Sequence, residues 1–144
     1  MKRRAFLALA GAGATAGLAG CFDGQAAATG DNRVEMTMDS FRPEELTVSP
    51  GTTVEFVNTS SHGHTVTGVS IPDEADDSEY FASGDFDDET AAQQSWEKNN
   101  GGILVQGETY ENEFVTPGRY DYICIPHIRV GMQGVIHVEE GADE

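Results

Sequence analysis

The sequence GRYDYICIPHIRVGMQGVIHV, at positions 118–138, decides how this chain folds. Tyr120, Tyr122 and Cys124 occur at every second position, so they share one face of an extended strand. If the tyrosines face a hydrophobic core, the Cys124 side chain enters the interior where that strand ends. A second strand is predicted over 135–138. The stretch therefore predicts two β-strands joined by a loop that begins at a buried cysteine.

The loop between these strands carries side chains that could bind a soft metal. Cys124, His127 and Met132 lie within nine residues and offer a thiolate, an imidazole and a thioether. A thiolate with imidazoles and a weak axial thioether is the donor set that selects copper, and zinc or iron sites seldom use methionine. Pro126 and Gly131 allow the chain to turn over a metal and return. A fourth ligand must come from elsewhere in the chain.

Three other histidines are candidates for that ligand. His137 has the opposite strand parity from Met132, so it is predicted to be a surface histidine. His62 and His64 both follow a predicted strand that ends near Asn58. His64 opens a β-branched run and is therefore expected to be held by a sheet, whereas His62 precedes a glycine in a loop. His64 is the favoured ligand and His62 the alternative.

The rest of the chain also predicts short strands separated by turns. Ser49-Pro50-Gly51 and Thr116-Pro117-Gly118 are turn signals. The predicted strands are 34–39, 46–48, 52–57, 65–69, 103–105, 110–115, 119–125 and 135–138. Short, punctuated strands of this kind favour an all-β sandwich of about seven to eight strands. An acidic insertion over 72–102 interrupts them, with one short helix expected around 89–96.

Composition limits the possible functions. The chain has 144 residues, with 25 Asp and Glu against 8 Lys and Arg and a formal net charge of -17. Nucleic-acid binders need clustered basic residues, so this class is excluded. The acidic excess is typical of proteins kept soluble in very high salt and predicts a halophilic source. The densest acidic stretch, 73–89, is therefore interpreted as a solvated surface, with a docking face for a basic partner as the alternative.

Residues 1–20 resemble an export signal. Arg3 and Arg4 fit a twin-arginine signal, and the uncharged stretch after them is shorter than the ~20 residues of a membrane-spanning helix. Residues 18–21, Leu-Ala-Gly-Cys, resemble a lipobox, which would make Cys21 a lipidated N-terminus, followed by a flexible tether over 21–32. The alternative is a secretory signal with an incidental cysteine. The predicted location is the outer face of the cytoplasmic membrane, through a lipid anchor.

Together these pieces resemble the type 1 blue copper proteins, or cupredoxins, and among them the plastocyanins and their haloarchaeal relatives, the halocyanins. The matching segments are 56–58, 64–66, 118–127, 131–132 and 134–136. The resemblance implies a Greek-key sandwich over residues 33–144 with one copper ion. It implies His64, Cys124 and His127 as equatorial ligands and Met132 as the long axial ligand.

The resemblance also implies which residues surround the ligands and where electrons leave. The implied neighbours of the site are Asn58, Thr65, Pro126, Ile128 and Val130, the last two as an exposed apolar patch beside the His127 ring. Thr65 stands where plastocyanins commonly have asparagine, which links the two ligand loops. Pro126 has no N–H and so cannot donate to the Cys124 sulfur.

The function implied by the resemblance is one-electron transfer without independent catalytic turnover. The expected partners are membrane redox proteins as donor and acceptor, and the chain is expected to be a monomer that shuttles between respiratory complexes. Two alternatives remain. One is a copper chaperone or scavenger, against which the single, buried-looking Cys124 argues. The other is an accessory redox subunit of a larger oxidase or reductase complex.

Overall fold

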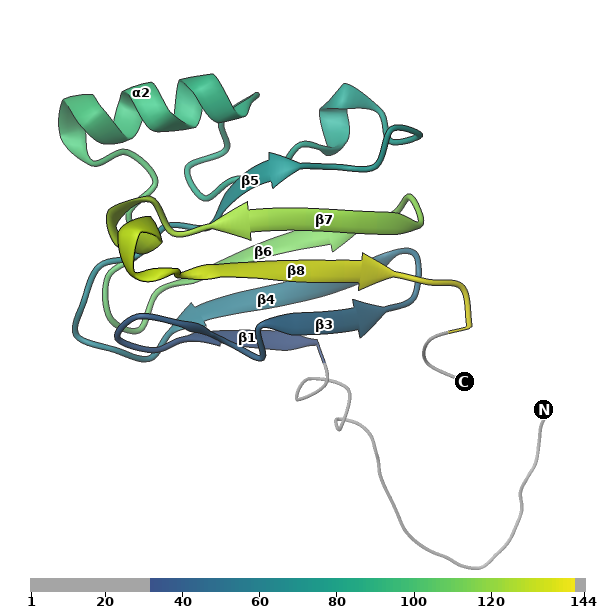
Figure 1. The fold of residues 1–144 in the computed structure, drawn as a ribbon, viewed down its shortest axis with the longest axis horizontal. Helices are drawn as coiled ribbons and strands as arrows, with labels where there is room; N and C mark the ends of the chain where they lie inside the picture. Colours follow the sequence, from purple (N-terminus) through teal and green to yellow (C-terminus); the bar gives the residue numbers. More distant parts are fainter. Residues whose placement is uncertain (1–31, 142–144) are drawn as a thin grey trace, which may run out of the picture. The chain divides into compact units, whose positions relative to one another are not determined.

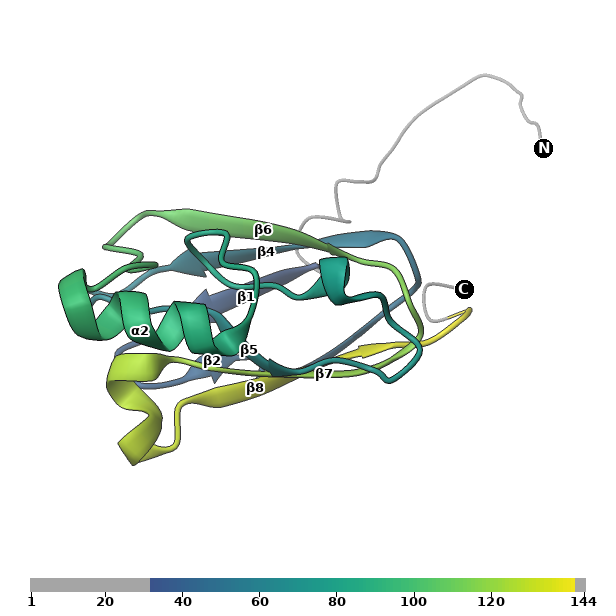
Figure 2. The ribbon, with the colours of Figure 1, turned by 90° about the horizontal axis from the view of Figure 1, so that it is seen from above.

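Two four-stranded sheets face each other in this computed structural model, which describes residues 32–141 (Figure 1). The first contains, in spatial order, β2 (Phe41–Arg42), β1 (Arg33–Met36), β4 (Thr52–Asn58) and β6 (Thr109–Phe114). The second contains β3 (Glu45–Val48), β8 (Gln133–Val138), β7 (Gly118–Ile123) and β5 (Thr67–Ser70). Figure 2 shows β4 and β6 in one layer and β7 and β8 in the other. The predicted β-sandwich is confirmed.

The described residues from Arg33 onward belong to one compact unit. The predicted export signal, Cys21 and the tether up to position 31 lie outside the described residues, so these remain predictions. Within 32–141, no helix combines the length and the apolar character needed to cross a membrane.

The core lies between the two sheets and is filled by alternate side chains of each strand. In β1, Val34 and Met36 are buried while Glu35 between them is exposed. In β7, Tyr120 and Tyr122 are buried on the same side. β1 pairs in parallel with β4, and β3 in parallel with β8, whereas the remaining strand pairs are antiparallel. The predicted parity of the tyrosines is therefore confirmed.

Four strand predictions are wrong in detail. The strand predicted over 34–39 ends at Met36, because the chain turns there and the Thr37 N–H donates to the Ser40 carbonyl at 2.9 Å. Residues 103–105 form no strand, because turns flank them on both sides, and Leu104 makes only one bridge. The strand predicted over 119–125 ends at Ile123, because a 3-10 helix, η3 (Ile125–Val130), begins where Pro126 cannot donate to a β-ladder. The strand predicted over 65–69 starts at Thr67. The two-residue strand β2 is too short to give a sequence signal.

The acidic insertion covers the free edge of β5. Gly68 N–H donates to the Phe81 carbonyl at 3.0 Å, and Ser83 N–H donates to the Val66 carbonyl at 2.7 Å. Phe81 is 1% exposed and belongs to the core between the sheets. The insertion therefore contributes to the sandwich and does not merely loop out from it.

The expected short helix is present as α2 (Glu89–Asn99), three residues longer than the predicted range. The Asp88 side chain caps its start by accepting from the Ala91 N–H at 2.8 Å. The helix ends at Asn100, which adopts a left-handed conformation. Only Ala92 on this helix is buried, so α2 lies on the surface of the molecule. The 3-10 helix η2 (Asp77–Glu79) precedes it in the same insertion.

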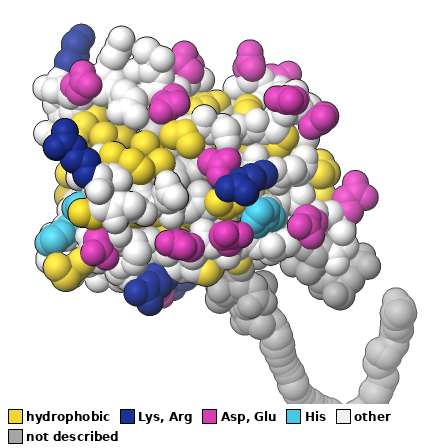
Figure 3. Space-filling view, in the orientation of Figure 1, with side chains coloured by type: hydrophobic (Ala, Val, Ile, Leu, Met, Phe, Trp, Pro, Cys, Tyr) yellow, Lys and Arg dark blue, Asp and Glu magenta, His cyan; other side chains and the backbone are white. Residues whose placement is uncertain are grey.

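Acidic side chains are spread over the surface rather than gathered into one patch on the face that Figure 3 shows. Most of the acidic residues between 73 and 89 are exposed. This distribution agrees with the interpretation of the acidic stretch as a solvated surface. The halophilic source remains a prediction.

Two core tyrosines differ in how their hydroxyl groups are satisfied, and this gives a stability prediction. The Tyr122 hydroxyl is buried without a hydrogen-bond partner among residues 32–141, whereas the Tyr120 hydroxyl donates to the Thr116 carbonyl at 2.6 Å. A buried hydroxyl without a partner costs free energy, so we expect Tyr122→Phe to raise the free energy of unfolding by about 1 kcal/mol. The matched control Tyr120→Phe should lower it by about 1 kcal/mol. Denaturant titration measures both, and a loss of stability in Tyr122→Phe would contradict the prediction.

Candidate metal centre

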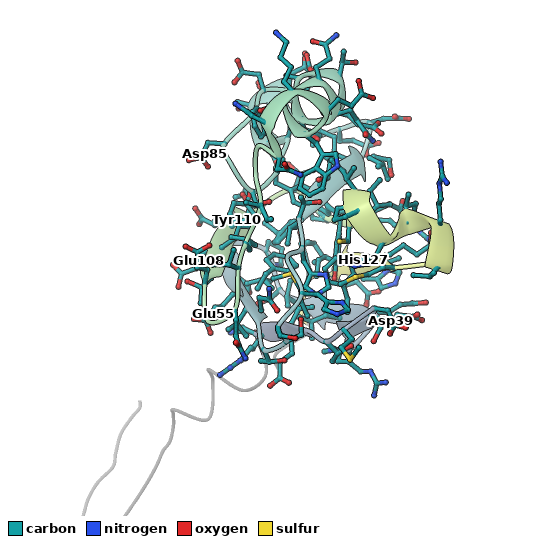
Figure 4. The ribbon with its side chains drawn as sticks, turned by 90° about the vertical axis from the view of Figure 1, so that its left-hand side faces the viewer. Asp39, Glu55, Asp85, Glu108, Tyr110 and His127 are labelled. Atoms are coloured by element: carbon teal, nitrogen blue, oxygen red, sulfur yellow. The ribbon has the colours of Figure 1, made fainter. Side chains whose placement is uncertain are left out.

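Three potential ligands converge at one end of the sandwich. The Cys124 sulfur lies 3.3 Å from His127 Nδ1 and 3.5 Å from His64 Nδ1. The ligand atoms of these three residues all lie within 4.8 Å of one another. Figure 4 looks at this end of the molecule and shows His127 beside η3. The structure thus brings together residues that the sequence separates by up to 63 positions.

The backbone of His64 is hydrogen-bonded to a loop that is distant in the sequence. Its N–H donates to the Leu104 carbonyl at 3.1 Å, and its carbonyl accepts from the Leu104 N–H at 2.7 Å. The His64 side chain is fully buried, whereas His62 is exposed. The structure therefore favours His64 over His62, although a single β-bridge holds it rather than the predicted strand. His137 bonds Glu45 at 2.9 Å on the outside of the second sheet, so its prediction as a surface histidine is confirmed.

Backbone hydrogen bonds close the loop that carries the other ligands. Cys124 N–H donates to the Met132 carbonyl at 3.1 Å, and Met132 N–H donates to the His127 carbonyl at 3.3 Å. His127 N–H donates to the Cys124 carbonyl at 3.1 Å. Gly131 has a φ of +87°, the left-handed conformation that glycine adopts without strain and that ends η3. Met132 is fully buried. These bonds fix the ligand loop on the end of the sandwich.

Burial sets the protonation states of the candidate ligands. It lowers the pKa of His64 to about 4, with the neighbouring His127 as a second cause. It also lowers the pKa of His127, followed by the effect of His62. Both imidazoles are therefore mostly neutral at pH 7, which is the form that binds metals. Burial raises the pKa of the Cys124 thiol to about 11, so binding a metal there requires the loss of its proton.

The donor set fits copper. Two imidazole nitrogens and a cysteine sulfur face one another, and a buried methionine lies on the same closed loop. Thiolate and thioether are soft ligands, and imidazole suits copper in either oxidation state. His64, Cys124, His127 and Met132 are thus arranged as a type 1 copper site.

Thr65 links the two segments that carry the ligands. Its hydroxyl oxygen accepts from the Ile125 N–H and from the Thr67 hydroxyl, both at 2.9 Å. Hydrogen bonding from the Thr65 backbone, the His127 backbone and the Thr65 hydroxyl partly offsets the rise that burial causes in the pKa of the Cys124 thiol. Threonine therefore connects the His64 and Cys124 segments in this chain.

Thr65→Val tests this link, because valine keeps the shape and loses the hydroxyl. The Ile125 N–H then loses its acceptor, so we expect the free energy of unfolding to fall by about 1–3 kcal/mol. The copper-loaded variant should also have a lower reduction potential, since a hydrogen bond to the thiolate is lost. Thr65→Ser should restore both properties. A Thr65→Val variant with an unchanged potential, measured by redox titration, would contradict the proposed contact with the sulfur.

The other implied neighbours of the site lie either behind the ligand loop or on η3. Asn58 is fully buried behind the ligand loop and donates through Nδ2 to the carbonyls of His62 and Leu104 at 2.6 and 2.8 Å. Pro126 opens η3. Ile128 and Val130 lie on η3 with His127 and are 38% and 67% exposed. They form an apolar surface there, and a role in electron exit remains a prediction.

Two contacts near the site were not predicted from the sequence. The His62 ring stacks against the His127 ring with centroids 5.8 Å apart and an angle of 15° between the planes. The Ser60 hydroxyl lies 3.0 Å from His64 Nε2, on the side of the ring away from Cys124. No local pattern pointed to Ser60, because its contact with His64 depends on how the segment between Asn58 and His64 folds.

The chain matches the model of the copper binding proteins, plastocyanin/azurin family, over residues 28–139. It is 32% identical to amicyanin-alpha from Methylorubrum extorquens over 142 residues, covering 96% of this chain and 100% of that protein. It is 30% identical to a plastocyanin from Scenedesmus fuscus, covering 76% of this chain and 100% of the relative. The solved structure of oxidised plastocyanin from Dryopteris crassirhizoma superposes with a TM-score of 0.53 at 24% identity, covering 74% and 99% of the two chains.

Proposed function

Because the chain belongs to the plastocyanin/azurin family of copper-binding proteins, we propose that it is a one-electron carrier with a single type 1 copper ion. The observation that carries this proposal is the burial of the ligands. His64, Cys124 and Met132 are fully buried, and His127 alone is partly exposed. A substrate molecule could not reach the buried ligands, whereas an electron could leave through the exposed edge of one ring.

Bound copper would supply the exchange of one electron by cycling between Cu(I) and Cu(II). The chain supplies a rigid frame for the ligands. The bridge between His64 and Leu104 and the closed loop from Cys124 to Met132 leave the ligands little freedom to move. A site whose ligands keep their positions in both oxidation states reorganises little on electron transfer. This rigidity supports a carrier rather than a catalyst.

The surface around His127 is suited to brief docking of a redox partner. Ile128 and Val130 are exposed on the same 3-10 helix as His127. The exposed Ile103 is adjacent to Leu104, which bridges His64. Ile103 lies against Gly63, because a β-carbon on that glycine would come within 2.6 Å of Ile103 Cδ1. In Figure 4, Asp39 lies on the same side of the molecule as His127. Small, mainly apolar contacts are typical of weak electron-transfer complexes.

We further propose that the partners are membrane redox proteins and that the chain is held at the outer face of the cytoplasmic membrane by lipid on Cys21. The support is in the sequence: the paired arginines at 3–4, the lipobox-like residues 18–21 and the tether that follows. One lipid modification must carry more than one chain to anchor a protein stably. The chain is proposed to work as a monomer in high salt, as expected for a halocyanin-like protein whose acidic surface keeps it soluble.

The spectrum of the Cu(II)-loaded protein in high salt tests the proposed function. We expect an intense thiolate-to-copper absorption and a narrow copper hyperfine splitting in electron paramagnetic resonance. Ascorbate should bleach the colour and ferricyanide should restore it. A folded protein with the spectrum of ordinary tetragonal Cu(II) would contradict the proposal. For the anchor, Cys21→Ser should move the protein from the membrane fraction to the soluble fraction.

The structure bears on one of the two alternatives. A copper chaperone needs exposed ligands that exchange their metal, and the full burial of Cys124 and His64 argues against this role. An accessory role in a larger redox complex remains an alternative. Co-purification with an oxidase or reductase from solubilised membranes would support that role over a free carrier.

A further inference from the structure

A buried hydrogen-bond network lies behind the His64 ring. It consists of Asn58, Ser60 and His64, which are 0%, 8% and 0% exposed. The network is on the opposite side of the ring from Cys124, because Ser60 faces Nε2 and the cysteine sulfur faces Nδ1. Since water has little access to this network, each polar hydrogen in it must be donated to an acceptor among the groups present. The positions of the hydrogens can therefore be worked out from the contacts.

The Asn58 side chain has one orientation that satisfies its surroundings. One of its terminal atoms lies 2.6 and 2.8 Å from the carbonyl oxygens of His62 and Leu104, so this atom must be the donor Nδ2. The other terminal atom lies 2.8 Å from the Ser60 backbone N–H and is the acceptor Oδ1. The amide is therefore fixed by three backbone groups.

This orientation directs the single proton of the Ser60 hydroxyl. Asn58 Oδ1 lies 2.9 Å from the Ser60 oxygen and accepts that proton. The His62 carbonyl is farther from it, at 3.3 Å, and already accepts from Asn58 Nδ2. The remaining lone pairs of the Ser60 oxygen face the His62 N–H at 3.2 Å and His64 Nε2 at 3.0 Å. Ser60 can thus only accept from the His64 ring.

From this geometry we infer that Ser60 is a positioning residue that fixes the tautomer of His64, with the proton on Nε2 and the lone pair of Nδ1 directed at the metal position. This inference rests on the proposed function, because it concerns a histidine that would bind the proposed copper ion. A neutral imidazole has one N–H, so accepting it at Nε2 leaves Nδ1 free to bind. Nδ1 is the atom that faces the Cys124 sulfur.

The consequence is that the ligand is prepared before a metal enters. The Thr37 backbone also hydrogen-bonds His64, so it is the remaining partner of the ring once the Ser60 hydroxyl is removed. With that one partner, the two tautomers of the buried neutral imidazole can interchange more readily, and the ring can turn more freely about its χ2 bond. Groups that hydrogen-bond the outer nitrogen of a ligand histidine fix both its tautomer and the orientation of its ring. Their loss typically lowers metal affinity about 10- to 100-fold. Ser60 should therefore act on copper binding without touching the metal.

Nitrogen NMR of the metal-free protein at neutral pH tests the inference directly. We expect the His64 ring of the full chain to show a protonated Nε2 and an unprotonated Nδ1 in a single tautomer. In Ser60→Ala the signals should show a mixture of tautomers, and the affinity for Cu(II), measured by competition with a chelator, should fall about 10- to 100-fold. Ser60→Thr keeps a hydroxyl and should restore both results.

Ser61→Ala is the matched control, because Ser61 is adjacent in sequence and exposed. It should leave the tautomer and the Cu(II) affinity unchanged. A His64 ring protonated on Nδ1 in the unsubstituted protein would overturn the inference, as would a Ser60→Ala variant with an unchanged tautomer. The tautomer is read without copper, so a copper-loaded protein that fails to transfer electrons would overturn the proposed function and leave this result in support of the inference.

Discussion

Cys124→Ser should abolish the intense visible absorption of the copper-loaded protein, whereas Cys21→Ser should leave it unchanged. The chain has only these two cysteines, so the same substitution at each gives a matched pair. Cys124 is fully buried, and its sulfur lies 3.3 and 3.5 Å from the two ligand nitrogens. Its thiolate is the donor from which the absorption arises, and a serine hydroxyl is a poor substitute for a soft thiolate.

The effect on the protein itself should be smaller than the effect on colour. Serine is close to cysteine in size, and the backbone bond between Cys124 and Met132 does not involve the side chain. We therefore expect the metal-free variant to fold, which circular dichroism in high salt can check. Retention of the intense band by Cys124→Ser would rule out the proposed ligand set. Loss of the band in Cys21→Ser would show that the colour depends on the other cysteine.

Phe81→Ala should lower the free energy of unfolding by about 3–5 kcal/mol, the usual cost of removing a fully buried aromatic ring. The Phe81 ring packs edge-on against Phe114 with centroids 5.1 Å apart, and against Tyr120 and Tyr122 at 6.2 Å. Truncation would leave a cavity between rings from both sheets. Denaturant titration followed by tryptophan fluorescence would measure the loss.

Phe86→Ala is the control, because Phe86 belongs to the same insertion and is only partly buried. It should cost about 1 kcal/mol, since much less apolar surface is involved. Equal losses in the two variants would contradict the conclusion that the insertion contributes one core residue to the sandwich. A small loss in Phe81→Ala would show that the insertion is independent of the core.

The sequence predicted those parts of the structure that depend on local patterns. The parity of Tyr120, Tyr122 and Cys124 gave their common burial, because strand alternation holds over a few residues regardless of what the strand contacts. Cys124, His127 and Met132 are close in sequence, so a single turn brings them together. These features need no knowledge of the rest of the fold.

Features set by distant contacts were harder to predict. His64 is held by Leu104, forty residues later in the sequence. Residues 103–105 make this contact through one bridge and do not form the strand that their apolar character suggests. The role of Ser60 depends on the orientation of the Asn58 amide, which Leu104 helps to fix. Burial of Phe81 within an acidic insertion was likewise hidden, because the acidic residues around it dominate the local pattern.

The hydrogen bonds along β5 have a consequence for how copies of the protein behave toward one another. An unpaired strand edge is a template on which another chain can add a strand. At 1 M salt, charges are screened beyond ~3 Å, so the acidic surface would do little to keep neighbouring molecules apart. On this side of the second sheet, the backbone groups of Val66 and Gly68 are already bonded to Ser83 and Phe81. The insertion thus protects the β5 edge from edge-to-edge association under conditions in which repulsion between molecules fails.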